Sequence, residues 1–291
     1  MRITNKIIAA QIKETISQHA RRLQESQTAI ASGKRINKSS DDPVGTTQVI
    51  KQRAQIDRID QLNRNIDDGL GFLNRTDTVL SEVRSQLVRA KEIALAQANG
   101  TADASVRDSA VKEVTMILED VVGLANTEFN GRFIFAGHKT QTQPFQLDVS
   151  TVTYHGDEGQ IQRQIGFHET IQANIVGSDV FPQVFDTLIN LREAVQQNDQ
   201  GAIQAAIDDL DANIKTTLNT QADVGTRVNR LETQKERLLN AKRDITQILS
   251  DTEDVDLAEA ITEFSLKQTA LQAALESAAR IIQPSLLNFL R

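Results

Sequence analysis

Apolar residues recur at alternating spacings of three and four over most of the chain, the spacing of a stripe along an α-helix. The longest stripe spans about 44–98 without a proline, and shorter ones follow at 104–126 and 202–218. Another long stripe covers 221–251. Because short connections favour antiparallel neighbours, the pattern predicts a mainly α fold, an elongated antiparallel helical rod.

Two polar breaks separate the ends of the chain from this rod. Gly33 is typical of a helix C-terminus, and Asp42-Pro43 is typical of an N-cap followed by the first helical residue. Residues 252–256 form an acidic break near the other end. On chemistry alone, the first break is equally well an ordinary helix linker with a good cap.

Residues 129–178 follow a different pattern. Polar and apolar residues alternate there, and Gly156-Asp157-Glu158-Gly159 lies between two alternating runs like a hairpin turn. We therefore expect a small β-rich insert. The predicted domains are terminal helical arms at 1–42 and 252–291, a helical rod at 43–128 and 179–251, and the insert at 129–178.

The arms carry opposite charge. Residues 1–42 hold eight Lys/Arg against four acids, a net of +4, and residues 250–291 hold three bases against seven acids, a net of −4. This predicts that the arms pair as an antiparallel two-helix coiled coil. Their apolar seam is sparse, with His19 and Ser26 interrupting it, so we expect further burial against neighbouring subunits.

Chemistry-bearing residues give little support to an enzyme. Cysteine is absent, and the four histidines lack metal-ligand spacing, so no cofactor or metal is expected. The clusters Asp208-Asp209-Asp211 and Asp251-Glu253-Asp254 are interpreted as solvated helix faces. A net charge of −7 argues against nucleic-acid binding, and no apolar run is long enough for a membrane span or a signal peptide.

Four segments carry a family resemblance: Met1-Arg-Ile-Thr-Asn, the break from Gly33 to Gly45, residues 125–131, and Ser285-Leu-Leu-Asn-Phe-Leu-Arg. Each resembles the matching part of flagellins. Residues 130–137 (NGRFIFAG) with Gln143-Pro144-Phe145 are similar to the flagellin relatives at the hook–filament junction. The resemblance implies an extracellular structural subunit of the bacterial flagellum, exported without a cleaved signal peptide.

The resemblance also implies partners and roles. The subunit would form a ring with its own copies between hook-associated protein 1 and flagellin, after passing the flagellar export apparatus and an export chaperone. Asn37, Asp41, Asp42 and Pro43 would set the connection between arm and rod. The assembly contacts would come from the apolar arm residues Ile3, Ile7, Ile12, Ile16, Leu23, Ile30, Leu271, Leu275, Ile282, Leu286, Leu287 and Leu290.

Two other interpretations stay open. The chain could be a flagellin, forming the filament itself, although residues 133–137 favour the junction. A cytoplasmic coiled-coil scaffold would account for the helical stripes but not for the insert or the complementary ends.

Overall fold

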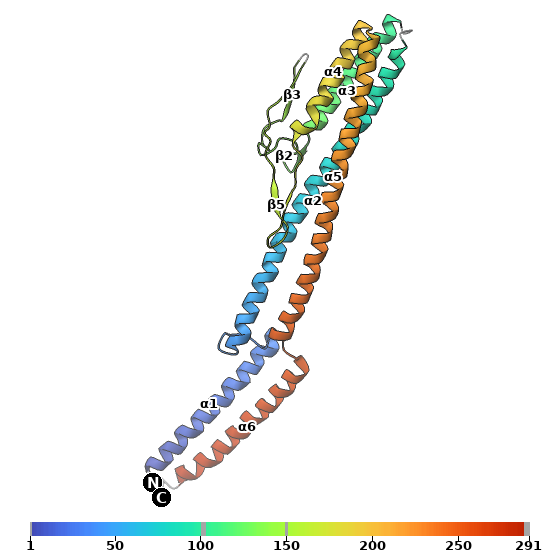
Figure 1. The fold of residues 1–291 in the computed structure, drawn as a ribbon. Helices are drawn as coiled ribbons and strands as arrows, with labels where there is room; N and C mark the ends of the chain where they lie inside the picture. The colour runs from blue at the N-terminus through green and yellow to red at the C-terminus, as the bar shows by residue number, and fades with distance from the viewer. Residues whose placement is uncertain (1, 100–102, 149–150, 288–291) are drawn as a thin grey trace. The chain divides into compact units, whose positions relative to one another are not determined.

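The computed structural model describes residues 2–99, 103–148 and 151–287, with side chains described from 6 to 280 inside those ranges (Figure 1). In the described part, long helices dominate, as the apolar stripes predict. The helices are α1 (Arg2–Ser32), α2 (Pro43–Ala98), α3 (Ala104–Ala125), α4 (Phe181–Gln197), α5 (Gln200–Glu253) and α6 (Leu257–Leu287), with a 3₁₀ turn η1 (Gly177–Asp179).

The chain divides into two compact units. The first comprises residues 1–58 and 241–291, and therefore holds α1, α6, the start of α2 and the end of α5. The second comprises residues 59–240. The boundaries of these two units differ from those predicted for the arms, the rod and the insert. The three-part division stays a prediction.

The core of the second unit lies between α2 and α5. Leu73, Leu80 and Leu87 of α2 and Leu210 of α5 are fully buried. Helices α3 and α4 pack against each other and cover the part of this pair farther from residue 59 (Figure 1). Four phenylalanines, at positions 135, 145, 181 and 185, pack ring against ring where the strands meet α4.

Six short strands form three separate two-stranded antiparallel sheets. Asn130 and Gly131 turn the first hairpin, both with positive φ (51° and 71°), which is the conformation that an Asn-Gly type I′ turn requires. The pairs are β1 (Glu128–Phe129) with β2 (Arg132–Phe133), β3 (Phe145–Leu147) with β4 (Val152–Tyr154), and β5 (Gln162–Gln164) with β6 (Thr170–Gln172).

The predicted hairpin turn at residues 156–159 is wrong. The strands on either side of it, β4 and β5, pair with β3 and β6 instead of with each other. The Asp157 carboxylate accepts hydrogen bonds from the backbone N–H groups of His138 (2.6 Å) and Gly159 (2.9 Å). The bond from His138, and one from the Asp157 N–H to the Ala136 carbonyl (3.1 Å), tie the segment to residues 136–138, where an added Cβ at Gly137 would collide with Asp157.

A predicted helix boundary between residues 218 and 221 is also wrong. Helix α5 is continuous where two helices were expected, because the threonine hydroxyls near residue 218 bond within the helix instead of interrupting it: Thr217 to the Asn213 carbonyl (2.9 Å) and Thr220 to the Thr216 carbonyl (3.0 Å). Helix α6 continues past Pro284 to Leu287.

Candidate functional site

The polar break after α1 forms a backbone junction with the connection between α5 and α6. Gly33, with a left-handed φ of 70°, turns the chain out of α1, and its carbonyl accepts from the Val255 N–H at 3.0 Å. The Arg35 N–H donates to the Glu253 carbonyl at 2.7 Å. Lys34 and Asp254 form the antiparallel bridge between these bonds. Two segments distant in sequence are thus fixed to each other.

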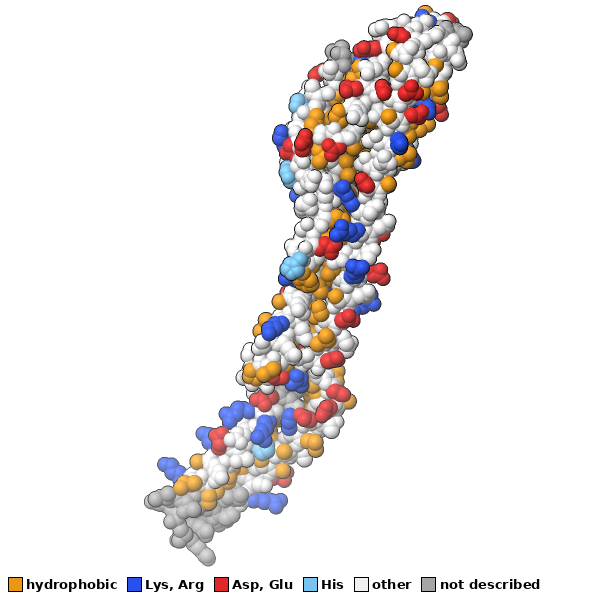
Figure 2. Space-filling model, in the orientation of Figure 1, with side chains coloured by type: hydrophobic (Ala, Val, Ile, Leu, Met, Phe, Trp, Pro, Cys, Tyr) orange, Lys and Arg blue, Asp and Glu red, His pale blue; other side chains and the backbone are white. Residues whose placement is uncertain are grey.

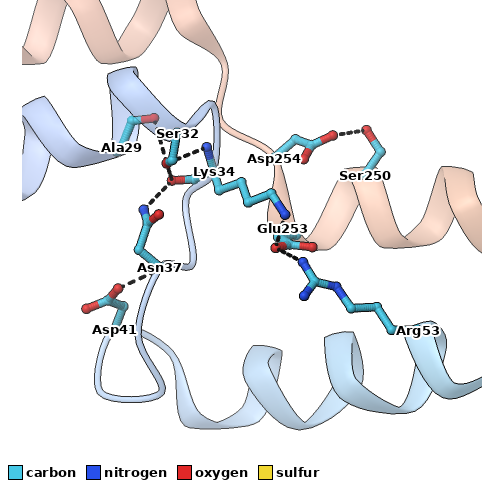
Figure 3. Close-up of polar contacts among 9 residues, drawn as sticks. All are labelled: Ala29, Ser32, Lys34, Asn37, Asp41, Arg53, Ser250, Glu253 and Asp254. Atoms are coloured by element: carbon cyan, nitrogen blue, oxygen red, sulfur yellow. Dashed lines mark hydrogen bonds and ion pairs between the residues drawn. The ribbon is translucent and has the colours of Figure 1, made fainter.

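Glu253 lies at the centre of this junction (Figure 3). Its carboxylate is 6% exposed and accepts from the Lys34 ammonium (2.8 Å) and from the Arg53 guanidinium (2.5 Å). Burial by itself raises the pKa of the Glu253 carboxyl, but the hydrogen bonds from Lys34 and Arg53 outweigh burial and lower that pKa below its ordinary value. One carboxylate therefore joins the segment after α1 and the first turns of α2 to the end of α5.

The loop between α1 and α2 is built around Asp41. The Asp41 carboxylate accepts from the backbone N–H groups of Asn37 (3.1 Å) and Lys38 (2.8 Å), and the Asn37 side-chain amide donates to the Lys34 carbonyl at 2.7 Å. The loop borders a groove between α1 and α6 whose lining mixes acidic and basic side chains. Asn37 and Asp41 thus shape the loop from within.

Asp42 caps α2, and Pro43 is its first residue. The Asp42 carboxylate accepts from the Gly45 N–H at 2.8 Å and lies 3.4 Å from the Arg35 guanidinium. The pKa of the Asp42 carboxyl is lowered, chiefly by the bond from Gly45. This is the N-cap and first-turn proline that the sequence predicts. The structure therefore places Asn37, Asp41 and Asp42 in the loop and Pro43 at the start of α2, and their predicted role in setting the connection between arm and rod stays a prediction.

The arms, α1 and α6, lie side by side and antiparallel within the first unit (Figure 1). Of the apolar arm residues predicted for assembly, Ile12, Ile16, Leu23, Ile30 and Leu271 are half-buried, whereas Ile7 (58%) and Leu275 (48%) are exposed. Ile3, Ile282, Leu286 and Leu287 lie outside the described side chains, and Leu290 lies outside the described residues. Their predicted roles stay predictions.

In the described part of the arms, the predicted charge complementarity does not take the form of ion pairs between α1 and α6. Among the described side chains, ion pairs of α1 and α6 lie within one helix, as in Arg21–Glu14 and Lys267–Glu263, and none joins α1 to α6. Among the described side chains of the first unit, two ion pairs between segments distant in sequence lie at the hinge, on Glu253. Across the visible face, acidic and basic side chains are interspersed (Figure 2).

The sequence did not reveal the central role of Glu253. Interpreting the cluster Asp251-Glu253-Asp254 as a solvated face is wrong for Glu253, which is buried, and right for its exposed neighbours. Its cationic partners lie about 200 residues away along the chain, in segments without a distinguishing motif. Only the position of Glu253 beside a polar break gave a hint.

Neither metal-ligating groups nor membrane spans are found in the described ranges. No three or more acidic or histidine side chains there are arranged to hold a metal ion. Of the helices as far as they are described, none combines the length and apolar character needed to cross a membrane.

Comparison with known proteins assigns the class. Residues 3–140 match the bacterial flagellin N-terminal helical region, and residues 207–290 match the bacterial flagellin C-terminal helical region. The chain belongs to the flagellin family, a family of structural proteins of the bacterial flagellum.

Within that family the chain is similar to flagellar hook-associated protein 3. It is 28% identical to that protein of Salmonella typhimurium, over 94% of this chain and 95% of the relative. It is also 26% identical to the flagellin of Bacillus subtilis, over 94% of each. Among solved structures, FlgL of Bacillus cereus matches with a TM-score of 0.62 and 26% identity, covering 69% of this chain and 99% of that one.

Proposed function

We propose that this chain is the junction subunit of the flagellum, a ring-forming protein between hook-associated protein 1 and the flagellin filament. The main support is the similarity to flagellar hook-associated protein 3 along 94% of the chain. The similarity to FlgL of Bacillus cereus, with 99% of that chain covered, adds to it. Catalysis forms no part of this role.

The arms are the proposed assembly surface. Among the described side chains of α1 and α6, the buried ones are Ser26, Ala260 and Ala278, so no large apolar side chain is fully covered. Burial of apolar area is the main favourable contribution to folding, and an arm pair with so little of it has much to gain from a neighbouring copy. Contacts between neighbouring subunits would then bury the apolar residues of the arms.

The same weakness suits export. The proposed route delivers the chain unfolded through the flagellar export apparatus, escorted by a chaperone, to the extracellular end of the hook. An arm pair that becomes ordered on contact with its neighbours couples folding to assembly. The hinge loop around Asn37, Asp41, Asp42 and Pro43 fixes where the ordered arm begins.

The deciding experiment removes the arms in the source bacterium. Deletion of residues 1–30 or 262–291 should leave hooks intact, abolish attached filaments and release flagellin into the medium. The full chain supplied from a plasmid should restore swimming. Filaments that persist unchanged in both deletions would rule out the junction role.

A filament subunit is the second candidate, because the Bacillus subtilis flagellin matches over 94% of each chain. Purified chain that polymerises into long filaments without other proteins would favour that function. Short rings, or monomers that bind only to hook ends, would favour the junction.

A further inference from the structure

In Figure 1 the hairpin of β5 and β6 lies beside α2, in a stretch where α3 and α4 are not beside the long helices, and its side chains also contact α5. Yet Ile66 of α2 and Leu231 of α5 are fully buried there. A pair of helices alone leaves much of its seam open to water, so a third element is needed to cover it. Ile165 and Ile171 of the hairpin are themselves buried.

The hairpin is attached to α2 by two contacts. The Arg163 guanidinium lies 2.7 Å from the Asp68 carboxylate, and the Asn65 side-chain amide donates to the Gln164 carbonyl at 3.0 Å. Asn65 and Asp68 are three residues apart and therefore share one face of the helix. The first strand of the hairpin is thus held to a single turn of α2.

Three side chains of α5 hold the rest of the hairpin. The Arg230 guanidinium lies 2.6 Å from the Glu169 carboxylate, and the Gln234 amide donates to the Ile165 carbonyl at 3.3 Å. Arg227 donates to the carbonyls of Gln172 (3.4 Å) and Asn174 (3.2 Å). Spacings of three and four place these side chains on one face of α5.

We propose that the β5–β6 hairpin is a clamp that fixes the register of α2 against α5. Helices packed on each other can shift by a whole turn, about 5.4 Å, when nothing else joins them. The hairpin is bonded to neighbouring turns of both helices. If α2 and α5 slid in opposite directions, the bonds to one of the two helices would have to break, so the hairpin opposes that shift. The direct pair of Lys235 with Asp67 (2.6 Å) lies at the same level and acts in the same sense.

The clamp goes beyond the junction role and is independent of it. A two-stranded hairpin is marginally stable alone, so the contacts with α2 and α5 keep the hairpin ordered. The ordered hairpin in turn keeps the two helices in register. The device would keep the unit stiff in either a ring or a filament.

Amide hydrogen exchange in the full chain tests the clamp. In Arg163→Asp the new carboxylate faces Asp68, and the amides of residues 62–73 and 227–238 should exchange about fivefold faster. Those of residues 80–95 should stay within about twofold of the original rates. Arg89→Asp is the matched control, because it reverses the charge opposite Glu113 of α3, away from the hairpin.

A charge swap completes the test. Asp68→Arg combined with Arg163→Asp should restore slow exchange in the clamped stretches, since the pair is re-formed with its signs exchanged. If Arg163→Asp fails to fold, Arg163→Gln, which removes the charge alone, should give the same local pattern with a smaller change. Unchanged exchange, an equal increase throughout the unit, or a swap that restores nothing would overturn the clamp.

Discussion

Arg53 and Glu253 are 200 residues apart in sequence, and the guanidinium of the first donates to the buried carboxylate of the second. The Lys34 ammonium shares the same carboxylate oxygen. The charge of a buried carboxylate is compensated only while its cationic partners remain in place, because losing one leaves buried charge without a partner. Within the described part of the first unit, this relationship joins α2 and the segment after α1 to the end of α5 through one buried carboxylate.

Replacing Glu253 by Gln should loosen that unit. Both cations lose their partner, and because Lys34 and Arg53 are themselves 39% and 49% exposed, water offsets part of the loss. We expect the free energy of unfolding to fall by about 1–3 kcal/mol, measured by urea titration of the circular dichroism signal. Glu263→Gln, an exposed acid of α6, is the control and should change it by less than about 0.5 kcal/mol. Equal effects of the two variants would contradict a central role for Glu253.

Acid should remove the stability that the ion pairs of Glu253 contribute. The pKa of the Glu253 carboxyl in the folded chain lies below its unfolded value, which is about 4.3. The ion pairs therefore stabilise the fold fully above that pH and are lost as the pH falls through the folded-state pKa. The stability difference between the original chain and Glu253→Gln should be constant from pH 7 to 5 and vanish at lower pH. A difference that persists at pH 2 would show that the carboxylate charge is not its source.

Gly45 is the position in the hinge loop and the cap of α2 where an added methyl group meets close neighbours. A Cβ there would lie 2.5 Å from an Asp42 carboxylate oxygen and 2.6 Å from the Ile36 Cδ1. Gly45→Ala should therefore displace the cap of α2 and lower stability by about 1 kcal/mol, although alanine favours helices. Gly123→Ala of α3, which meets open space, should instead raise stability by about 0.5–1 kcal/mol. Thermal unfolding of both variants measures the contrast, and a stabilising Gly45→Ala would refute the close packing.

Tyr154 reports on the insert because it is the only tyrosine and the chain has no tryptophan. Burial, followed by the negative charges of Asp157, Asp179 and Glu158, raises the pKa of its phenol to about 12. The hydroxyl donates to the carbonyls of Asp157 (2.9 Å) and Phe135 (3.1 Å). Stability from these bonds is complete below the unfolded pKa of about 10 and is lost as the pH rises through the folded value.

Absorbance of tyrosinate gives the measurement for Tyr154. The folded chain should titrate near 12 and the chain in concentrated guanidinium near 10. A folded chain that titrates near 10 would mean that the phenol is solvated.

Isolated monomers should lose their arms first to protease. The buried side chains of the described arms are small, and Lys13, Arg21 and Arg22 of α1 are exposed trypsin sites. Limited trypsin digestion followed by mass spectrometry should cut α1 before any site between residues 59 and 240. The same chain assembled on hooks should be cut more slowly at those sites. Resistance of residues 1–40 in the free monomer would argue against coupled folding and assembly.

Local patterns in the sequence predicted most of the helices and the cap. The proline-free apolar stripe before residue 98 became α2, and Asp42-Pro43 became its N-cap. The continuity of α5 was missed, because the two apolar stripes at 202–218 and 221–251 predict separate helices, whereas the polar residues between them bond within one helix. The hairpin turn predicted at 156–159 was wrong, because strand partners depend on contacts that alternation alone does not specify.

The hinge also shows that local sequence patterns do not predict contacts between distant segments. Asp42 acts on a residue three positions away, and a local motif reveals it. Glu253 acts on partners in other helices, and neither its spacing nor its neighbours distinguish it from a surface acid. Predicting its burial requires knowing that α5 ends beside α1 and α2.

The separation of Glu253 from its partners also sets an order of events in time. A chain that is made from its N-terminus presents Lys34 and Arg53 long before Glu253 exists, and closing a loop of 200 residues is slow as well as entropically costly. Helices can form early, but the hinge must wait for the last fifth of the chain. A product truncated before Glu253 would therefore carry Lys34 and Arg53 without the carboxylate that both contact.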